Sequence, residues 1–147
     1  MAMNTGKVVV GGLVAGLVMN IGDFVVNTML LAADNAAFMT RLGLNPAAME
    51  SFAGMLPWIV IDFLMGLLIG WTYAAIRPRF GPGVSTAIIA GLIPFLGVTL
   101  ILAGFTSMGV FTTGMFVKGS AAALVNTLIA AVAGAWLYTE ARVTGLD

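Results

Sequence analysis

Residues 8–33 read VVVGGLVAGLVMNIGDFVVNTMLLAA, an apolar run in which Asp23 is the only charged residue. Three further runs of the same kind occupy residues 52–76, 83–105 and 119–139. An α-helix needs about 20 apolar residues to cross the hydrocarbon core of a bilayer, and each run reaches that length. The pattern predicts an all-α protein whose residues 1–147 form a single transmembrane domain, a bundle of four membrane-spanning helices.

The composition also indicates a protein that lies in a lipid bilayer. Hydrophobic residues make up 61% of the chain, charged residues make up 8%, and the mean hydropathy is +1.09. This leaves too little polar surface to cover a soluble domain of this length. The first run is too long for a secretory signal peptide, and it contains Asn20 and Asp23. We therefore expect the lipid bilayer to be the partner of all four helices.

Charge balance and missing residue types exclude several functions. Six Lys and Arg residues balance six Asp and Glu residues, so there is no basic surface to attract nucleic acid. The chain has no Cys and no His. This removes disulfides, thiolate nucleophiles and the usual ligands of zinc and haem. We expect no metal, no cofactor and no nucleic-acid partner.

Catalytic motifs are also missing from the sequence. No His-Glu-x-x-His motif, Gly-x-Ser-x-Gly motif or phosphate-binding loop occurs. Intramembrane aspartyl proteases carry Tyr-Asp and Gly-x-Gly-Asp motifs. Here Asp62 follows Ile61, and Asp23 follows Gly22 with Asn20 in the place of the first glycine. We therefore expect a protein that is not an enzyme.

Basic and aromatic residues predict how the helices are oriented. If all four runs span the membrane, four basic residues lie on one side and two on the other. The positive-inside rule then places both termini and the turn at 77–82 in the cytoplasm. Four aromatic residues would form a belt at that interface, with Trp58 alone at the outer one. The inner basic residues are Lys7, Arg77, Arg79 and Arg142, the outer ones are Arg41 and Lys118, and the belt comprises Trp71, Tyr73, Trp136 and Tyr138.

Two short sequence motifs each occur twice, which suggests two internal repeats. The motif Trp-x-Tyr-x-x-x-Arg occurs at residues 71–77 and again at 136–142, and VAGLV at 14–18 corresponds to IAGLI at 89–93. Because two helices separate the copies, the two helical hairpins would point the same way, related by an axis along the membrane normal. The alternative is convergence, because aromatic and Arg anchors suit every cytoplasmic helix end.

Pairs of small residues four positions apart occur in all four runs, in the half of each helix that we expect near the cytoplasm. Such pairs let helix backbones approach closely in lipid, although chance also produces them where Gly and Ala are abundant. We expect them to pack helices together and to offer contact surfaces in an oligomer. The pairs are Gly12 with Gly16, Gly66 with Gly70, Ala87 with Gly91, and Ala130 with Gly134.

Residues 34–57 form the largest segment outside the predicted spans. Asn45 and Pro46 are typical of a helix start, with Asn as the cap and Pro in the first helical position. We expect one or two short interfacial helices in this segment. A helix running on from Pro46 into the second span would be longer than the membrane is thick, and Pro57 would be the point at which it bends.

Polar residues inside the spans are the main candidates for function, because an unpaired amide or carboxylate in hydrocarbon costs several kcal/mol. Those of the first run recur at spacings of three and four, which places them on one helix face. All except the central Asn20 lie in the outer half of the bilayer. This polar layer can bind an ion or solute, or it can hold helices together by hydrogen bonds. Its members are Asn20, Asp23, Asn27, Asp62, Thr99, Asn126 and Thr127.

The charged residues of this region are Asp23, Asp62 and Lys118. Asn would fill a permanently neutral structural role without a titratable group, so the two Asp residues are our candidates for binding a proton or a cation. If their carboxyl groups face one cavity, mutual repulsion favours protonation of at least one of them. Lys118 lies about two turns from Asn126. Its amine can pair with a carboxylate or extend to the interface, and we expect the latter.

The first helix carries a resemblance to known proteins. GGLVAG at residues 11–16, followed by MNIGDF at 19–24, resembles the opening helix of small four-helix bacterial membrane proteins of uncharacterised function. The resemblance covers about one helix. It implies a bacterial cytoplasmic membrane and implies no activity.

Two functions fit these observations. Four helices enclose little room, so a channel or carrier for a proton, cation or small polar solute would act as a homo-oligomer or with other membrane subunits. The alternative is a structural accessory subunit of a larger membrane complex.

Overall fold

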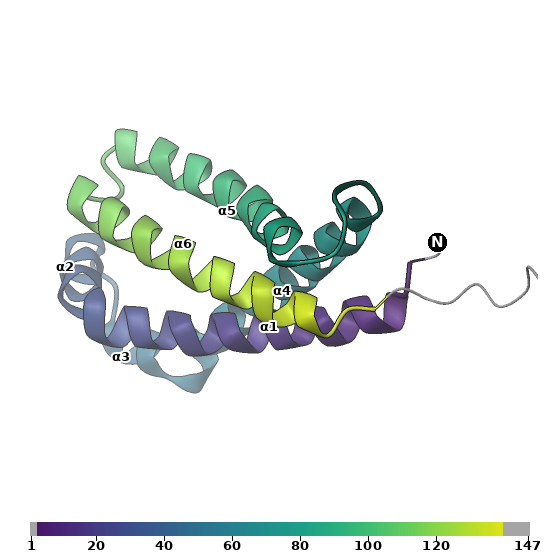
Figure 1. Cartoon of the computed structure of the whole chain (residues 1–147). Helices are drawn as coiled ribbons and strands as arrows, with labels where there is room; N and C mark the ends of the chain where they lie inside the picture. The colour runs from purple at the N-terminus through teal and green to yellow at the C-terminus, as the bar shows by residue number, and fades with distance from the viewer. Residues whose placement is uncertain (1–2, 140–147) are drawn as a thin grey trace, which may run out of the picture.

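The computed structural model describes residues 3–139, apart from the side chains of residues 48 and 49. This range is almost wholly helical and contains no β-strand. Four of its helices are long and apolar enough to cross a membrane, which confirms the predicted fold. The elements are α1 Thr5–Val25, the π-helical turn η1 Val26–Leu30, α2 Ala32–Leu42, α3 Pro46–Glu50, α4 Phe52–Phe80, α5 Val84–Ser107 and α6 Thr113–Trp136 (Figure 1).

Side-chain caps explain where three of the long helices begin. Asn4, Ser51 and Thr112 each accept a hydrogen bond from the backbone N–H three residues further on, at 3.1, 3.2 and 3.1 Å. Such caps satisfy N–H groups that the first turn leaves unpaired. The last of them starts α6 at Thr113, earlier than the predicted start at residue 119. The prediction followed the apolar run and overlooked the cap in front of it.

The segment between the first two spans contains α2 and α3. Helix α2 ends at Gly43, whose φ of 65° suits a residue without a side chain. Helix does not run on from Pro46 into α4. Instead, Ser51 is extended, with φ −68° and ψ 155°, and it caps α4. The interruption that we expected at Pro57 therefore lies at Ser51, and Pro57 is inside α4.

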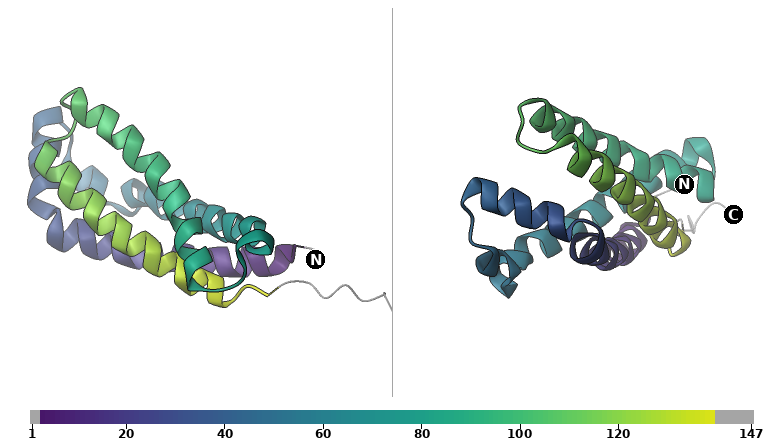
Figure 2. Two further views of the ribbon diagram at one scale, coloured as in Figure 1. Left: turned by 45° about the horizontal axis from the view of Figure 1, so that its top comes forward. Right: turned by 90° about the vertical axis from the view of Figure 1, so that its left-hand side faces the viewer.

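The chain forms two helical hairpins, α1 with α4 and α5 with α6, which pack on each other mainly through α1 with α6 and α4 with α5. We call the end of the bundle that carries Tyr73 and Tyr138 the tyrosine end, and the opposite end the α2 end. Helices α4 and α5 leave their shared turn at the tyrosine end and diverge toward the α2 end (Figure 2). Every buried residue of α5 lies between Thr86 and Pro94, in its first half. The bundle is therefore tightest toward the tyrosine end.

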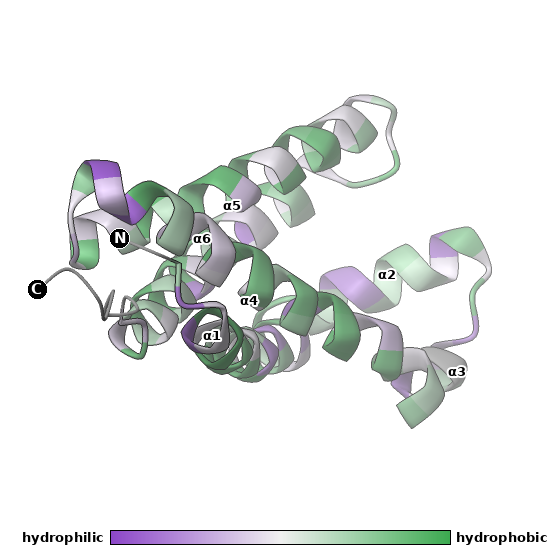
Figure 3. Cartoon of the chain, turned by 90° about the vertical axis from the view of Figure 1, so that its right-hand side faces the viewer, coloured by the Kyte–Doolittle hydropathy of each residue, from purple (hydrophilic) through white to green (hydrophobic). Residues whose placement is uncertain are grey.

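Large apolar side chains face outward along all four long helices. Phe24 of α1 is 64% exposed and Leu100 of α5 is 71% exposed. Figure 3 shows that hydrophobic residues predominate along the length of these helices. In water, apolar surface of this kind costs about 25 cal/mol per Å², whereas in a bilayer it faces lipid tails. Length and hydropathy together make the chain a multi-pass integral membrane protein.

Candidate functional site

Glycines bring the backbones of α1 and α4 into direct contact. A Cβ atom on Gly12 would lie 2.7 Å from the Cα of Leu67, and one on Gly16 would lie 2.7 Å from the Cα of Phe63. A Cβ on Gly66 would overlap backbone atoms of Gly12 and Gly16. A larger residue at any of these positions would push the two helices apart.

The other predicted packing glycines also face neighbouring helices of the same chain. Gly70 of α4 lies against the backbone of α1. A Cβ on Gly134 of α6 would lie 2.6 Å from the carbonyl oxygen of Gly11, and one on Gly91 of α5 would lie 2.9 Å from the Cβ of Ala131. These contacts occupy the glycine faces that we expected a neighbouring subunit to use.

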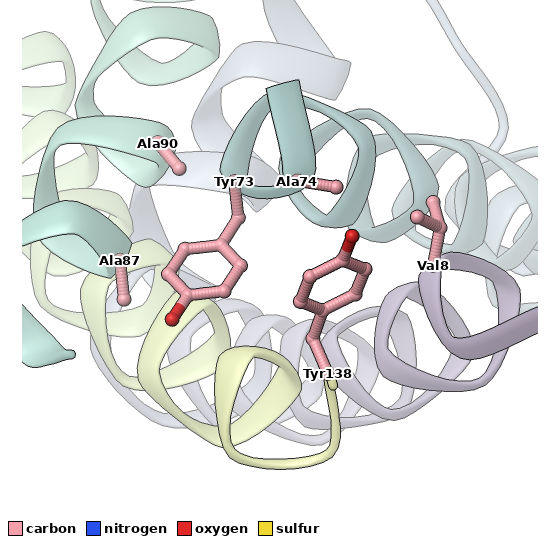
Figure 4. Packing of buried hydrophobic residues seen from close by; sticks show 6 residues of the cluster. All are labelled: Val8, Tyr73, Ala74, Ala87, Ala90 and Tyr138. Carbon is pink, nitrogen blue, oxygen red and sulfur yellow. The ribbon is translucent and has the colours of Figure 1, made fainter. Parts of the chain in front are cut away.

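Tyr73 and Tyr138 pack together at the tyrosine end (Figure 4). Their rings meet edge to face, with centroids 5.8 Å apart and planes at 84°. The Tyr73 hydroxyl accepts a hydrogen bond from the N–H of Gly83 at 3.2 Å, and the Tyr138 hydroxyl accepts one from the N–H of Asn4 at 3.4 Å. The guanidinium of Arg77 lies 5.4 Å from the centroid of the Tyr138 ring.

These contacts correct the aromatic belt that we predicted. Tyr73 and Tyr138 are 4% and 6% exposed, whereas Trp71 and Trp136 are 55% and 83% exposed. Residues two apart on an α-helix point about 200° apart around its axis, so Tyr73 faces the interior when Trp71 faces lipid. Tyr138 follows the last turn of α6 and points into the bundle. Arg142, which ends the second motif, lies outside the described residues.

The tyrosine contacts relate the two hairpins in the same way. Gly83 precedes α5 and Asn4 precedes α1, so each tyrosine binds the first residue of the other hairpin. When residues 14–18 are aligned with 89–93, Ala15 and Ala90 are equivalent positions. Both are fully buried. The same alignment carries Asn4 onto Arg79 and not onto Gly83, so the two tyrosine contacts are alike in kind without involving equivalent partners, and the two parallel repeats stay a prediction.

A polar cluster lies between α1, α4 and α6. Asn126 of α6 is buried, and its Nδ2 donates to the carbonyl oxygen of Met19 at 3.0 Å and to Oδ1 of Asp23 at 2.7 Å. Asp62 of α4 is 8% exposed, and its carboxyl group is close enough to that of Asp23 for the two to interact electrostatically. The structure therefore brings three of the predicted polar residues, each from a different helix, into one cluster, in which Asn126 and Asp23 are hydrogen-bonded.

Asn20 and Gly22 support this cluster from α1. Asn20 Nδ2 donates to the carbonyl oxygens of Gly16 at 3.0 Å and of Ile59 at 3.3 Å, and the second bond ties α1 to α4. A Cβ on Gly22 would overlap the side chain of Asn126, so this glycine makes room for the amide. We did not predict the role of Gly22, although its place beside Asp23 is a signal that could have indicated it.

The π-helical turn η1 begins at Val26, three residues after Asp23, and was also not predicted. The N–H of Leu31 bonds to the carbonyl oxygen of Val26 at 2.9 Å, the five-residue spacing of a π-helix. Turns of this kind occur often at functional sites. No pattern in the sequence marks this one.

Three predicted members of the polar layer lie apart from the cluster, and one of them, Thr127, is buried on α6. Asn27 is exposed on η1, where its Nδ2 donates to the carbonyl oxygen of Asp23 at 2.8 Å and its Oδ1 accepts from Asn35 at 3.1 Å. It therefore links α1 to α2. Thr99 is half-buried on α5, and no hydrogen bond within residues 3–139 joins it to the carboxyl groups.

Lys118 and Arg41 connect α2 to the hairpin of α5 and α6. Lys118 Nζ lies 2.9 Å from Oδ2 of Asp34, so Lys118 pairs with a carboxylate and does not simply extend to the interface as we expected. Arg41 donates to the carbonyl oxygens of Gly109, at 3.3 Å, and of Val110. Both basic side chains of the α2 end are engaged away from the polar cluster.

The carboxyl pair has no basic partner in the part of the chain that the structure describes. No Lys or Arg there forms an ion pair with Asp23 or Asp62. The same residues contain no group of three or more His, Cys, Asp and Glu side chains that could hold a metal ion. Buried charge without a counter-charge is costly, so these two carboxyl groups stay the candidates for binding a proton or a cation.

Comparison with known proteins does not identify a family. No protein-family model, curated protein or solved structure matches the chain. The fold and the site define a four-span integral membrane protein with a paired-carboxyl cluster between three of its helices.

Proposed function

We propose that this protein binds a proton or a small cation at Asp23 and Asp62, within the membrane, and moves it through an oligomer of the chain. The observation that carries the proposal is that two acidic side chains, the buried Asp62 and the half-buried Asp23, lie among apolar helices, where Asp23 accepts a hydrogen bond from Asn126. Within residues 3–139 no basic side chain neutralises this pair. Intramembrane acidic residues of this kind typically mark ion and proton pathways.

Helix adhesion alone does not account for two carboxyl groups. An interhelical hydrogen bond in a membrane contributes about 0.6 kcal/mol and at most about 2 kcal/mol. Asn at positions 23 and 62 would supply such bonds without a titratable group. Two carboxyl groups side by side repel each other when both are ionised, and a shared proton or a bound cation removes that repulsion.

The packing of the bundle suggests from which side the site is reached. Between the cluster and the tyrosine end, glycine contacts bring α1 into contact with α4 and with α6. Toward the α2 end, α4 and α5 diverge (Figure 2). We propose that the ion enters from the α2 end. Because the helices pack closely between the cluster and the tyrosine end, we propose that the rest of its route runs between subunits. This is why an oligomer is part of the proposal.

The orientation of the proposed transporter follows from its basic residues. Lys7, Arg77 and Arg79 lie at the tyrosine end, and Arg142 follows α6 in sequence. The positive-inside rule then favours a cytoplasmic tyrosine end. The resemblance of residues 11–24 supports a bacterial cytoplasmic membrane as the location.

Ion flux into proteoliposomes tests the proposal. We expect the wild-type protein to carry a proton or cation current, and we expect Asp23→Asn and Asp62→Asn each to abolish it without loss of expression or oligomeric state. Asp34→Asn is the matched control, because Asp34 pairs with Lys118 outside the cluster and its loss should leave the current in place.

Absence of flux in the wild-type protein, or unchanged flux in both Asn variants, contradicts the proposal. Native mass spectrometry of the gently solubilised protein distinguishes the alternative. A homo-oligomer supports the transport function. Co-migration with other membrane proteins, together with absent flux, would instead indicate a structural accessory subunit.

A further inference from the structure

We infer that α2 is a lid over the α2 end of the bundle, and that it opens by turning about its two ends to admit the ion. The inference rests on the proposed function, which places the entrance of the ion at that end. Three features of α2 support it: the position of the helix, its loose packing and the breaks in the helix at both of its ends.

Helix α2 lies between the two hairpins at the wide end of the bundle. It follows η1 of the first hairpin, and its side chains contact the α5–α6 turn of the second. Viewed along the bundle from either end, α2 lies between that turn and α3, which leads into α4 (Figure 2 and Figure 3). Helix α2 is therefore placed where α4 and α5 have diverged.

Helix α2 is loosely packed. Ala32–Leu42 includes no buried residue, whereas each of the four long helices has at least five. A cavity of about 120 Å³, with room for several water molecules, lies between α2 and the start of α6. It is lined by Asp34, Ala37, Phe38, Arg41, Thr112 and Met115. Segments with few buried contacts open at a lower free-energy cost than the core of a fold, so α2 can move without disturbing that core.

Polar contacts hold α2 against the second hairpin. The Nζ of Lys118 lies 2.9 Å from Oδ2 of Asp34, and Arg41 donates to the carbonyl oxygens of Gly109 and Val110. The side chain of Lys118 is 52% exposed and that of Asp34 is 23% exposed, so water competes for both charges. Contacts of this kind hold a segment in place without preventing its release.

An aromatic contact lies beside these polar ones. The Phe38 ring of α2 stacks on the Phe111 ring of the α5–α6 turn, with centroids 5.3 Å apart and planes at 23°. The Phe111 ring also meets the Phe105 ring at the end of α5, with centroids 6.5 Å apart. Phe111 thus links α2 to α5 through two ring contacts.

Both ends of α2 are breaks in the helix. At its start, Leu31 has φ −105° and ψ 5°, which separates α2 from η1. At its end, Gly43 has a φ of 65°, which glycine adopts without strain. Hinges typically lie at such ends of elements, where a few residues absorb the change in backbone angles. A hydrogen bond of 3.1 Å from Asn35 to Asn27 keeps the start of α2 beside η1, so opening releases the second hairpin and leaves α2 attached to the first.

A reversible cross-link tests the inference in the full-length protein, which contains no Cys. The double variant Phe38→Cys with Phe111→Cys places two thiols where the stacked rings lie, and a short bifunctional methanethiosulfonate reagent joins them. We expect the cross-link to abolish flux in proteoliposomes and a reductant to restore it. Unchanged flux after complete cross-linking would overturn the lid.

The double variant Phe105→Cys with Phe111→Cys is the matched control. It uses the same turn residue and the same reagent, but it ties the turn to α5 and leaves α2 free. We expect this cross-link to leave flux in place. Equal loss of flux in both cross-linked variants would show that flux depends on the turn and not on α2, and would overturn the inference.

Access to the polar cluster tests the lid without transport. Asp23→Cys places a thiol in the cluster, and a water-soluble methanethiosulfonate reagent modifies it from the α2 end. We expect Arg41→Met with Lys118→Met, which removes polar contacts of α2, to raise the rate of modification several-fold. Arg79→Met, at the tyrosine end, is the control and should leave the rate unchanged. An equal rate with and without the contacts of α2, or no modification in either protein, would overturn the inference.

Failure of the inference and failure of the proposed function are distinguishable. Flux that persists through the cross-link of α2 refutes the lid and leaves the proposed function in place. Faster modification after loss of the polar contacts, in a protein without flux, supports the lid and removes the transport function.

Discussion

The two hairpins share a scaffold and differ in chemistry. A Cβ on Gly16 of α1 would lie 3.1 Å from the carbonyl oxygen of Asp62, and one on Gly91 of α5 would lie 3.4 Å from the carbonyl oxygen of Thr127. The repeat shifts carry Gly16 onto Gly91 and Asp62 onto Thr127, so the two hairpins make the same backbone contact. At this contact the first hairpin has the carboxyl group of Asp62, whereas the second has the hydroxyl group of Thr127.

Other equivalent positions of the two hairpins also differ in size and polarity. Gly66 of the first hairpin corresponds to Ala131 of the second, and Asp23 corresponds to Val98. The first hairpin therefore combines closer backbone packing with both carboxyl groups, while the second contributes Asn126 as a donor. The shared scaffold does not produce the site by itself. Acidic side chains in one hairpin produce it, and an amide from the other hairpin binds Asp23.

The largest expected effect concerns the backbone contact of the first hairpin. Gly66→Leu should destabilise the protein by about 3 kcal/mol or more, because its side chain would overlap the backbone of α1. The counterpart substitution Ala131→Gly should cost only about 1 kcal/mol, because it removes one methyl group. Unfolding by SDS titration in mild detergent measures both, and equal costs would show that the hairpins do not differ in packing.

The next effect concerns the carboxyl group itself. Asp62→Leu should abolish flux and also weaken the contact of α1 with α4 by roughly 1–2 kcal/mol. Thr127→Val, the matched change in the second hairpin, should leave flux in place, because Thr127 lies outside the carboxyl cluster. Flux in proteoliposomes and SDS unfolding check the two parts. If both variants lose flux equally, the chemical difference between the repeats is not the basis of function.

A smaller effect is expected at the tyrosine end, and it should be the same for both tyrosines. Tyr73→Phe and Tyr138→Phe each remove one hydroxyl that accepts a backbone hydrogen bond at the start of a hairpin. Each should lower the free energy of unfolding by about 1 kcal/mol. Unfolding of the two single variants in the same detergent checks the symmetry of the pair. A cost at only one tyrosine would argue against equivalent repeats.

The smallest effect is expected at the ion pair of α2. Lys118 and Asp34 are partly exposed, and a pair of this kind contributes at most about 1 kcal/mol. A double-mutant cycle with Lys118→Met and Asp34→Asn measures the coupling. A coupling of several kcal/mol would mean that the attachment of α2 is a main source of stability.

Hydropathy was sufficient to predict the four spans, because helix length and apolar content follow directly from the bilayer. It was also sufficient to select the carboxyl pair and Asn126, since polar residues are rare at this depth. It did not show that Asn27 and Thr99 lie apart from the pair. Helical spacing gives the face of a residue on its own helix, but contact with a second helix depends on crossing geometry, which the sequence pattern does not contain.

Side-chain partners across helices were the least predictable part. The inward position of Tyr73 follows from its spacing of two from Trp71, and that signal was available in the sequence. The pairing of Lys118 with Asp34 depends on where α2 folds back, and nothing local to either residue indicates it. The π-helical turn after Asp23 likewise has no pattern of its own.

The uptake of protons by purified protein tests the central claim most directly. The wild-type protein and Asp62→Asn are titrated in the same detergent with a pH-indicator dye, and the difference between the two curves reports the carboxyl pair. We expect the wild-type protein to bind one more proton per chain than the variant. Superimposable curves would contradict the account, because Asp62 would then hold no exchangeable proton.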